Sequence, residues 1–138
     1  MSGLAALLAG HTPPDVYQWH NAAHVEDVQH AVEHAGWTFR HLDGWTLEDR
    51  DAFTKALCAA VESPDADSLD QISLESGGGN GTVLLWDGWS PLARHDEPCF
   101  QEALGILSRR TQGEGGAFAV VLRGEGPPLD LEELPVKH

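Results

Sequence analysis

Four short segments of the chain carry the apolar patterns of β-strands. The expected strands are residues 15–19 (DVYQW), 37–42 (WTFRHL), 82–86 (TVLLW) and 117–122 (AFAVVL). The last two are nearly continuous apolar runs, a pattern typical of strands that are covered on both faces. The chain is therefore expected to contain a sheet that lies between two layers of other structure.

Between these segments the apolar residues recur at helical spacing. The expected helices are about residues 23–35, a helix that starts near Thr46 and runs to Val61, a short helix at about 66–74, and a helix from Asp96 to Arg110. Thr46 followed by Asp49 resembles a capping box, with Asp in place of the usual Glu. Strands that alternate with helices in this way predict an α/β fold with a short parallel sheet and helices on both faces.

A length of 138 residues fits one domain, because it is ample for a single hydrophobic core. We expect this domain to span residues 1–124, and we expect residues 125–138 to form an acidic, Pro-containing tail that is loosely held. Within the domain, residues 15–35 are expected to form a strand and a helix in addition to those of residues 37–124. A parallel strand added at the sheet edge would cover an edge that otherwise invites aggregation.

The chain is strongly acidic, with 22 Asp and Glu against 8 Lys and Arg and a formal net charge of −14. This charge argues against binding to nucleic acid or to an anionic membrane surface, because both require clustered basic residues. It is compatible with a basic protein, a metal or a cationic ligand as the partner, and it also favours solubility.

The sequence contains no sign of a membrane or secretory segment. No apolar run approaches the roughly 20 residues that a membrane-spanning helix needs. The apolar stretch at residues 4–9 follows no Lys or Arg, so it lacks the basic start of a secretory signal. The two cysteines, Cys58 and Cys99, cannot form a disulfide framework and are expected to be small buried residues. These features predict a cytoplasmic protein.

Motifs for metal binding and catalysis are weak. His30 and His34 lie four residues apart on one expected helix, a spacing that two metal ligands could share, but no third ligand accompanies them. His41 and Asp43 alternate on one strand, so they could form an acid–base pair or be simple neighbours. Residues 65–76 lack the turn glycine and the final glutamate of a calcium loop. We therefore expect no metal, no cofactor and no enzymatic activity.

One short motif occurs twice. Asp-Gly-Trp follows an expected strand at residues 43–45 and again at residues 87–89. In a parallel sheet both turns would lie at the carboxyl edge, where open α/β sheets often bind ligands. The same residues are also explained by a turn at Asp-Gly, with the tryptophan covering the core.

Acidic residues without basic neighbours are concentrated in the middle of the chain. No Lys, Arg or His occurs between Lys55 and Arg94. That interval contains Glu62, Asp65, Asp67, Asp70, Glu75 and Asp87. Because neighbouring carboxylates repel one another, a cationic partner would stabilise this region. A solvated loop is the alternative.

The order of these segments resembles the barstar family of ribonuclease inhibitors over about residues 37–124. The matching segments are 37–42, the helix through Phe53 and Leu57, Ser63-Pro64-Asp65, residues 68–72 (SLDQI), residues 82–89, the helix around Phe100–Leu107, and residues 119–124. The resemblance implies a three-layer fold with a short parallel sheet between helices. It also implies an inhibitor that blocks a basic ribonuclease inside the cell, using acids of a short helix and its preceding loop in place of RNA phosphates.

The resemblance places the partner-binding residues in the acidic interval. Asp70 matches the first acid of the family's short-helix signature, and Asp65, Asp67 and Glu75 lie close to it in the chain. The leading prediction is a barstar-like inhibitor that binds a basic, barnase-type ribonuclease through these four residues.

The family's two other acidic positions do not hold acids in this chain. Leu74 takes the place of the second acid, and the third acid, on the later helix, would fall near Arg109. The alternative is therefore a barstar relative that shares only the framework and has another protein-binding or assembly role. In that case Trp45 and Trp89 of the two turns would matter more than the acids.

Overall fold

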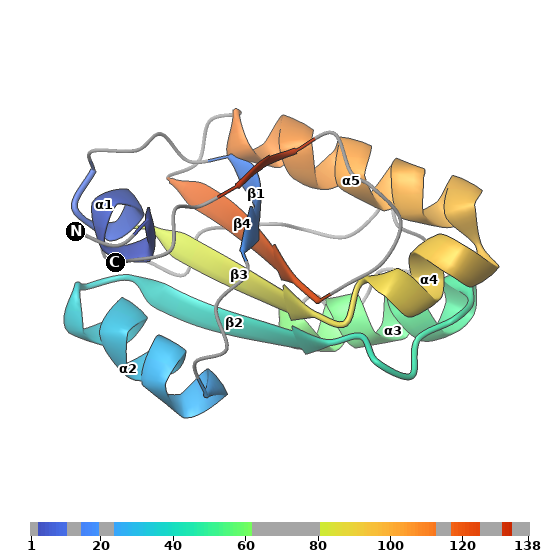
Figure 1. The fold of residues 1–138 in the computed structure, drawn as a ribbon, viewed down its shortest axis with the longest axis horizontal. Coiled ribbons are helices and arrows are strands. Elements are labelled where there is room, and N and C mark those ends of the chain that lie inside the picture. The colour runs from blue at the N-terminus through green and yellow to red at the C-terminus, as the bar shows by residue number, and fades with distance from the viewer. Residues whose placement is uncertain are drawn as a thin grey trace.

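The computed structural model describes residues 3–10, 15–19, 24–61, 81–112, 117–124 and 131–133. Within them the chain forms a parallel sheet with the strand order β2-β3-β4-β1-β5 (Figure 1). The strands are β1 (Val16–Trp19), β2 (Thr38–Asp43), β3 (Thr82–Asp87), β4 (Phe118–Arg123) and β5 (Glu132–Glu133). The helices are α1 (Gly3–Leu8), α2 (Val25–His34), α3 (Arg50–Ala60), α4 (Ser90–His95) and α5 (Glu97–Thr111). The predicted α/β fold with a parallel sheet is confirmed.

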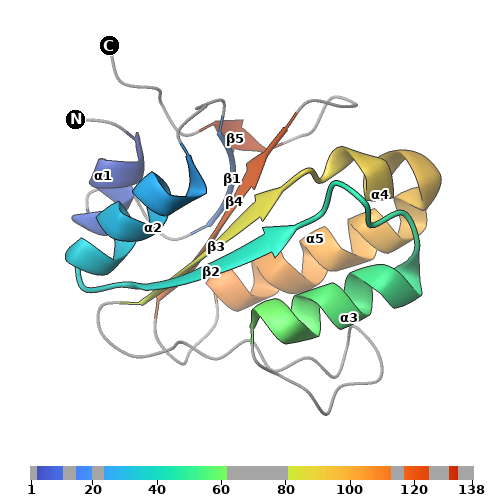
Figure 2. The ribbon, with the colours of Figure 1, turned by 90° about the horizontal axis from the view of Figure 1, so that it is seen from below.

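Helices cover both faces of the sheet, which gives the molecule three layers (Figure 2). On one face, Leu7 of α1 and Val28 and Val32 of α2 form a buried cluster with Val83 and Leu85 of β3. Helices α3, α4 and α5 lie on the other face. Strand β3 is buried along its whole length, as its continuous apolar sequence predicts.

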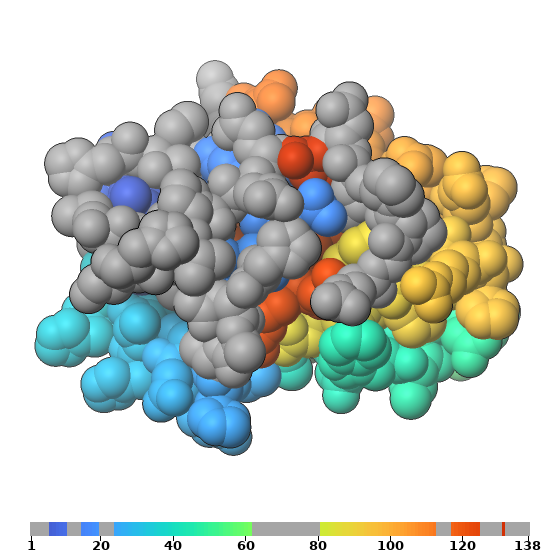
Figure 3. Space-filling view, in the orientation of Figure 1, coloured from blue at the N-terminus to red at the C-terminus, as the bar shows by residue number. Residues whose placement is uncertain are grey.

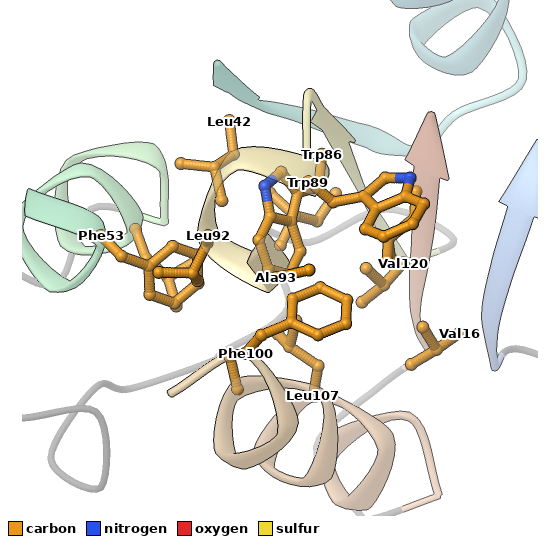
Figure 4. Close-up of a cluster of buried hydrophobic side chains, with 14 of the residues drawn as sticks. Val16, Leu42, Phe53, Trp86, Trp89, Leu92, Ala93, Phe100, Leu107 and Val120 are labelled. Carbon is orange, nitrogen blue, oxygen red and sulfur yellow. The ribbon is translucent and has the colours of Figure 1, made fainter. Parts of the chain in front are cut away.

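The core between the sheet and α3, α4 and α5 is built around aromatic rings (Figure 4). The ring of Trp86, on β3, lies 4.9 Å from that of Phe53 on α3 and 5.6 Å from that of Phe100 on α5. Trp89 stacks on Phe100 at 5.5 Å. These rings are almost completely buried, and aromatic contacts of this kind add to the free energy gained by burying their area.

The start of α3 differs from the predicted capping box. Its N-cap is Asp49, whose carboxylate accepts a hydrogen bond from the backbone N–H of Ala52 at 2.8 Å. Thr46 lies before this position, in an exposed turn. The capping role predicted for Thr46 is therefore wrong, because Asp49 itself satisfies a first-turn N–H group.

The start of α5 matches its prediction, whereas the helix before it was not predicted. Asp96 caps α5 by accepting a hydrogen bond from the backbone N–H of Cys99 at 3.2 Å. Helix α4 fills the short interval between β3 and this cap. The helix expected at about residues 66–74 lies outside the described residues.

Strand β1 is parallel to β4, as expected for an added strand, but it does not form the edge of the described sheet. Val16 and Trp19 align with Val120 and Arg123 of β4. On its other side β1 pairs with β5, which comes from the segment expected to be a tail. This second pairing was not predicted. It supplies backbone hydrogen-bond partners to the outer side of β1, which would otherwise be an open edge.

Both cysteines are buried and free, which confirms the expectation that they are small core residues. Burial raises the pKa of the Cys99 thiol, so this residue is less reactive than an exposed cysteine. No described helix combines the length and the hydropathy that crossing a bilayer requires.

Candidate functional site

The carboxyl ends of three strands meet at one edge of the sheet. Asp43 of β2 aligns with Asp87 of β3, and Asp87 aligns with Arg123 of β4. Both Asp-Gly-Trp turns therefore start at this edge, as the parallel sheet predicts. The backbone N–H of Gly44 donates to the carbonyl oxygen of Asp87 at 2.7 Å, which joins the first turn to the second.

Asp87 is the centre of a cluster of charged side chains at this edge. Its Oδ1 accepts from Nε of Arg123 at 2.6 Å, and its Oδ2 accepts from Nη2 of Arg123 at 3.0 Å. Nε2 of His41, on β2, lies 3.0 Å from the same Oδ2. The Asp87 side chain is only 9% exposed, and that of Arg123 is 15% exposed. The cluster links β2, β3 and β4 through their side chains.

The environment of Asp87 favours its ionised form. Burial of the carboxylate raises its pKa. The hydrogen bonds from Arg123 and His41 together lower the pKa by more than burial raises it, so it lies below its ordinary value. Both carboxylate oxygens already have partners. The cluster is thus arranged to hold a charge in place, and we assign it a structural role at the sheet edge.

This cluster corrects two expectations from the sequence. His41 pairs with Asp87, not with Asp43, so the suggested acid–base pair on one strand is wrong. Asp87 also does not belong among the acids that lack a basic neighbour, because Arg123 neutralises it. The sequence signal was present: an Asp and an Arg each end an apolar strand, and such charges are seldom buried unless they are paired.

The two tryptophans of the Asp-Gly-Trp turns have different environments. Trp89 is 1% exposed and belongs to the aromatic core, as the turn-and-cover interpretation predicts. Trp45 is 55% exposed, and it is the exposed large hydrophobic residue of the described chain. Its backbone N–H donates to Oδ1 of Asp43 at 3.3 Å. The carboxyl edge therefore presents one tryptophan ring to solvent.

The acids predicted to bind a partner lie outside the described residues. They are Asp65, Asp67, Asp70 and Glu75, within residues 62–80. The described chain ends before them at Val61, after α3, and resumes at Gly81, before β3. Gly81 accepts a hydrogen bond from Thr38 at 2.8 Å, so the chain re-enters at the amino end of the sheet. This is the end opposite to the Asp87 cluster.

Three further residues singled out from the sequence are described. Arg109, at the place of the family's third acid, is exposed in the last turn of α5. His30 and His34 are exposed on α2, with ring centroids 6.0 Å apart. Among the described residues, no group of three His, Cys, Asp or Glu side chains is arranged to hold a metal ion.

Comparisons of this chain with models of protein families, with curated proteins and with solved structures found no match.

Proposed function

We propose that this protein is an inhibitor that binds a basic, barnase-type ribonuclease through the acidic residues of segment 62–80. The observation that carries the proposal is the distribution of charge. Once Asp87 is set aside as the partner of Arg123, the acids between Lys55 and Arg94 all fall within this one segment, which contains no basic residue. A cationic partner relieves the repulsion among them.

The fold supports the same proposal. The described elements follow one another in the order β2, α3, β3, α4, α5 and β4, and in the sequence the acidic segment falls between α3 and β3. This is the order on which the resemblance to barstar-like inhibitors rests. In that arrangement the acids take the place of RNA phosphates at the cationic active site of the nuclease.

The net charge of −14 affects the rate of association as well. Charges of opposite sign on two proteins steer their encounter, and dissolved salt screens this attraction over about 10 Å at 0.1 M. Binding to a basic ribonuclease is therefore expected to weaken as salt is added, mainly through slower association.

The alternative role, in another protein complex, is favoured by one specific observation. Arg109 places a positive charge on the exposed surface of α5 where the resemblance calls for an acid. A positive charge there would repel a basic nuclease. Binding to a partner that is not a ribonuclease would use the same fold and would not depend on the four acids.

Calorimetric titration with a purified barnase-type ribonuclease tests the proposal. The titration compares the wild-type chain with the double variant Asp67→Asn/Asp70→Asn at ionic strengths of about 0.02 M and about 0.15 M. The double variant is expected to bind at least tenfold more weakly at the lower salt, because two charges opposite cationic groups are lost.

A matched control removes two charges elsewhere. Glu26 and Glu33 are exposed on α2, which lies on the opposite face of the sheet from α3. The variant Glu26→Gln/Glu33→Gln changes the net charge by the same amount and should bind within about twofold of wild type. Equal losses in the two double variants would assign the binding to net charge alone. The absence of binding at either salt would contradict the ribonuclease proposal and favour the alternative.

A further inference from the structure

Trp45 is held in a fixed position at the carboxyl edge of the sheet. Its backbone N–H is bonded to Asp43, and its indole ring lies against the backbone of two glycines that follow neighbouring strands. A Cβ at Gly88 would lie 2.5 Å from Cδ2 of the ring, and a Cβ at Gly124 would lie 3.3 Å from its Cη2. A side chain at Gly88 would displace the ring, and one at Gly124 would be in tight contact with it.

The exposed part of this ring is available to a ligand. Trp45 is 55% exposed although one side of it packs on the glycines. A ring that is already immobilised loses little conformational entropy on binding, and tryptophan is enriched among the residues that dominate binding energy at interfaces. The position of Trp45 thus suits a contact point better than a freely rotating side chain would.

The charges around Trp45 determine what kind of ligand fits. Residues 42–49 contain the acids Asp43, Glu48 and Asp49 and no Lys, Arg or His. Asp43 is exposed and forms no ion pair with the part of the chain that the structure describes. The nearby charge of Arg123 is neutralised by Asp87. Glu48 pairs with His95 at 3.0 Å and Asp49 caps α3, so the exposed carboxylate of Asp43 supplies the negative charge of this site.

A cation is the ligand that satisfies both features. The face of an indole ring attracts a guanidinium or an ammonium group, and a neighbouring carboxylate strengthens this attraction. A second copy of this chain is disfavoured, because each molecule carries a net charge of −14.

We propose that Trp45 and Asp43 form a docking site for an arginine side chain of a basic protein, with the guanidinium against the indole ring and beside the carboxylate. This site does not include the acidic segment of the proposed function. Segment 62–80 joins the described chain at the amino end of the sheet, whereas Trp45 lies past the carboxyl end of β2. Strands of six residues place these two ends about 17–20 Å apart.

The location also separates this loop from α2. In the space-filling view, the surface of α2 (blue and cyan) and the surface of the chain that follows β2 (teal and green) occupy opposite ends of the lower edge (Figure 3). Charge changes on α2 can therefore serve as a control for this site too.

Nuclear magnetic resonance titration with a capped Gly-Arg-Gly peptide tests the proposal. The readouts are the indole N–H signal of Trp45 and the backbone N–H signals of Gly88 and Gly124, which lie beside the ring. The arginine peptide is expected to shift all three signals in a saturable manner. The same peptide with uncharged citrulline in place of arginine is expected to leave them unchanged.

Variants at Trp45 and at Asp43 separate the contributions of ring and charge. Trp45→Leu should raise the apparent Kd, followed at Gly88 and Gly124, by about two- to fivefold, and Trp45→Phe should raise it less. Asp43→Asn retains an acceptor for the Trp45 N–H and removes the charge, so it should weaken binding by about twofold. Glu26→Gln/Glu33→Gln should have no effect. Unfolding temperatures of all variants establish that each is folded.

Three results would overturn the proposal. They are equal shifts with the arginine and citrulline peptides, saturable shifts confined to signals away from Trp45, and an unchanged Kd in both Trp45 variants. Shifts of Trp45 that depend on protein concentration without any peptide would assign this surface to self-association instead. The double variant Asp67→Asn/Asp70→Asn should keep the peptide site, so its loss of ribonuclease binding is a distinct result.

Discussion

At the scale of single residues, the buried charges at the sheet edge have a direct consequence for stability. Asp87 and Arg123 are joined by two hydrogen bonds and are largely removed from water. An ion pair of this kind need not stabilise a protein relative to apolar residues, but removing one partner leaves the other charge buried. The cluster is thus a point at which one substitution has a large effect.

The substitution Asp87→Asn is expected to lower the free energy of unfolding by about 2–4 kcal/mol, because Arg123 loses its counter-charge in a mostly buried site. Denaturant unfolding at neutral pH measures this change. Asp43→Asn, at the adjacent exposed position on β2, is the matched control and should change stability by about 0.5 kcal/mol or less. Similar losses in the two variants would contradict the structural role of Asp87.

The lowered pKa of Asp87 predicts that the stability of the protein depends on pH. The pKa of Asp87 is lower in the folded protein than its ordinary value of 3.8, so the folded state holds the proton less tightly than the unfolded state does. The stabilisation is present above pH 3.8 and is lost as the pH falls through the lower folded-state pKa. Unfolding measured at a series of pH values should therefore show the wild type and Asp87→Asn converging in acid. A stability difference between wild type and Asp87→Asn that stays constant over the pH series would contradict the lowered pKa of Asp87.

Replacing either of two glycines by alanine should change stability, with opposite sign at the two positions. Gly88 has φ +70° and lies against Trp45, so Gly88→Ala should destabilise the fold by about 1 kcal/mol or more. Gly105 is in the exposed part of α5 with no neighbouring atom within 4 Å of a new Cβ, so Gly105→Ala should stabilise the fold by about 0.5–1 kcal/mol. Thermal unfolding of both variants measures the two changes, and a stabilising Gly88→Ala would refute the assigned packing.

At this scale the sequence predicted which residues are buried better than it predicted which side chains pair with one another. Apolar runs indicated that β3 and β4 are covered on both faces, and both are buried. The pairing of His41 with Asp87 spans 46 positions in the chain, and it depends on strand register. Local sequence patterns do not contain this register, so the sequence alone offers only the neighbour along the strand, Asp43, as a possible partner of His41.

At the scale of elements, helix caps determine where α3 and α5 begin. Asp49 and Asp96 each accept a hydrogen bond from a backbone N–H three residues ahead. Both positions also place a negative charge near the positive end of a helix. The order of strands and helices followed from periodicity, but the exact starting residue required knowledge of which side chain makes the cap.

The role of Asp49 as the cap of α3 can be tested against Thr46, the cap that the sequence pattern predicts. Asp49→Ala should lower the free energy of unfolding by about 1 kcal/mol, because the N–H of Ala52 loses its acceptor. Thr46→Ala, at an exposed position outside the helix, should change it by about 0.5 kcal/mol or less. Denaturant unfolding distinguishes the two, and a larger effect at Thr46 would restore the capping-box assignment.

Three elements, α1, α4 and β5, were not predicted, because each is short. Helix α4 is six residues long, too short for apolar periodicity to be visible, and proline occupies its first turn. Strand β5 has two residues, Glu132 and Glu133, whose acidic sequence gives no strand signal. Its pairing with β1 is made by the backbone, and it therefore leaves little trace in the side chains.

At the scale of the whole molecule, the charge of −14 separates into parts with different roles. Asp87 is neutralised inside the fold, and Asp49 and Asp96 cap helices. Segment 62–80 contains five further acids and no basic residue. We propose that this segment binds a basic ribonuclease.

The cleavage of RNA by a barnase-type ribonuclease tests this claim most directly. Rising amounts of this protein should abolish the cleavage near equimolar ratio, and Asp67→Asn/Asp70→Asn should inhibit much less at the same concentrations. Full ribonuclease activity in the presence of excess wild-type protein at low salt would contradict the claim.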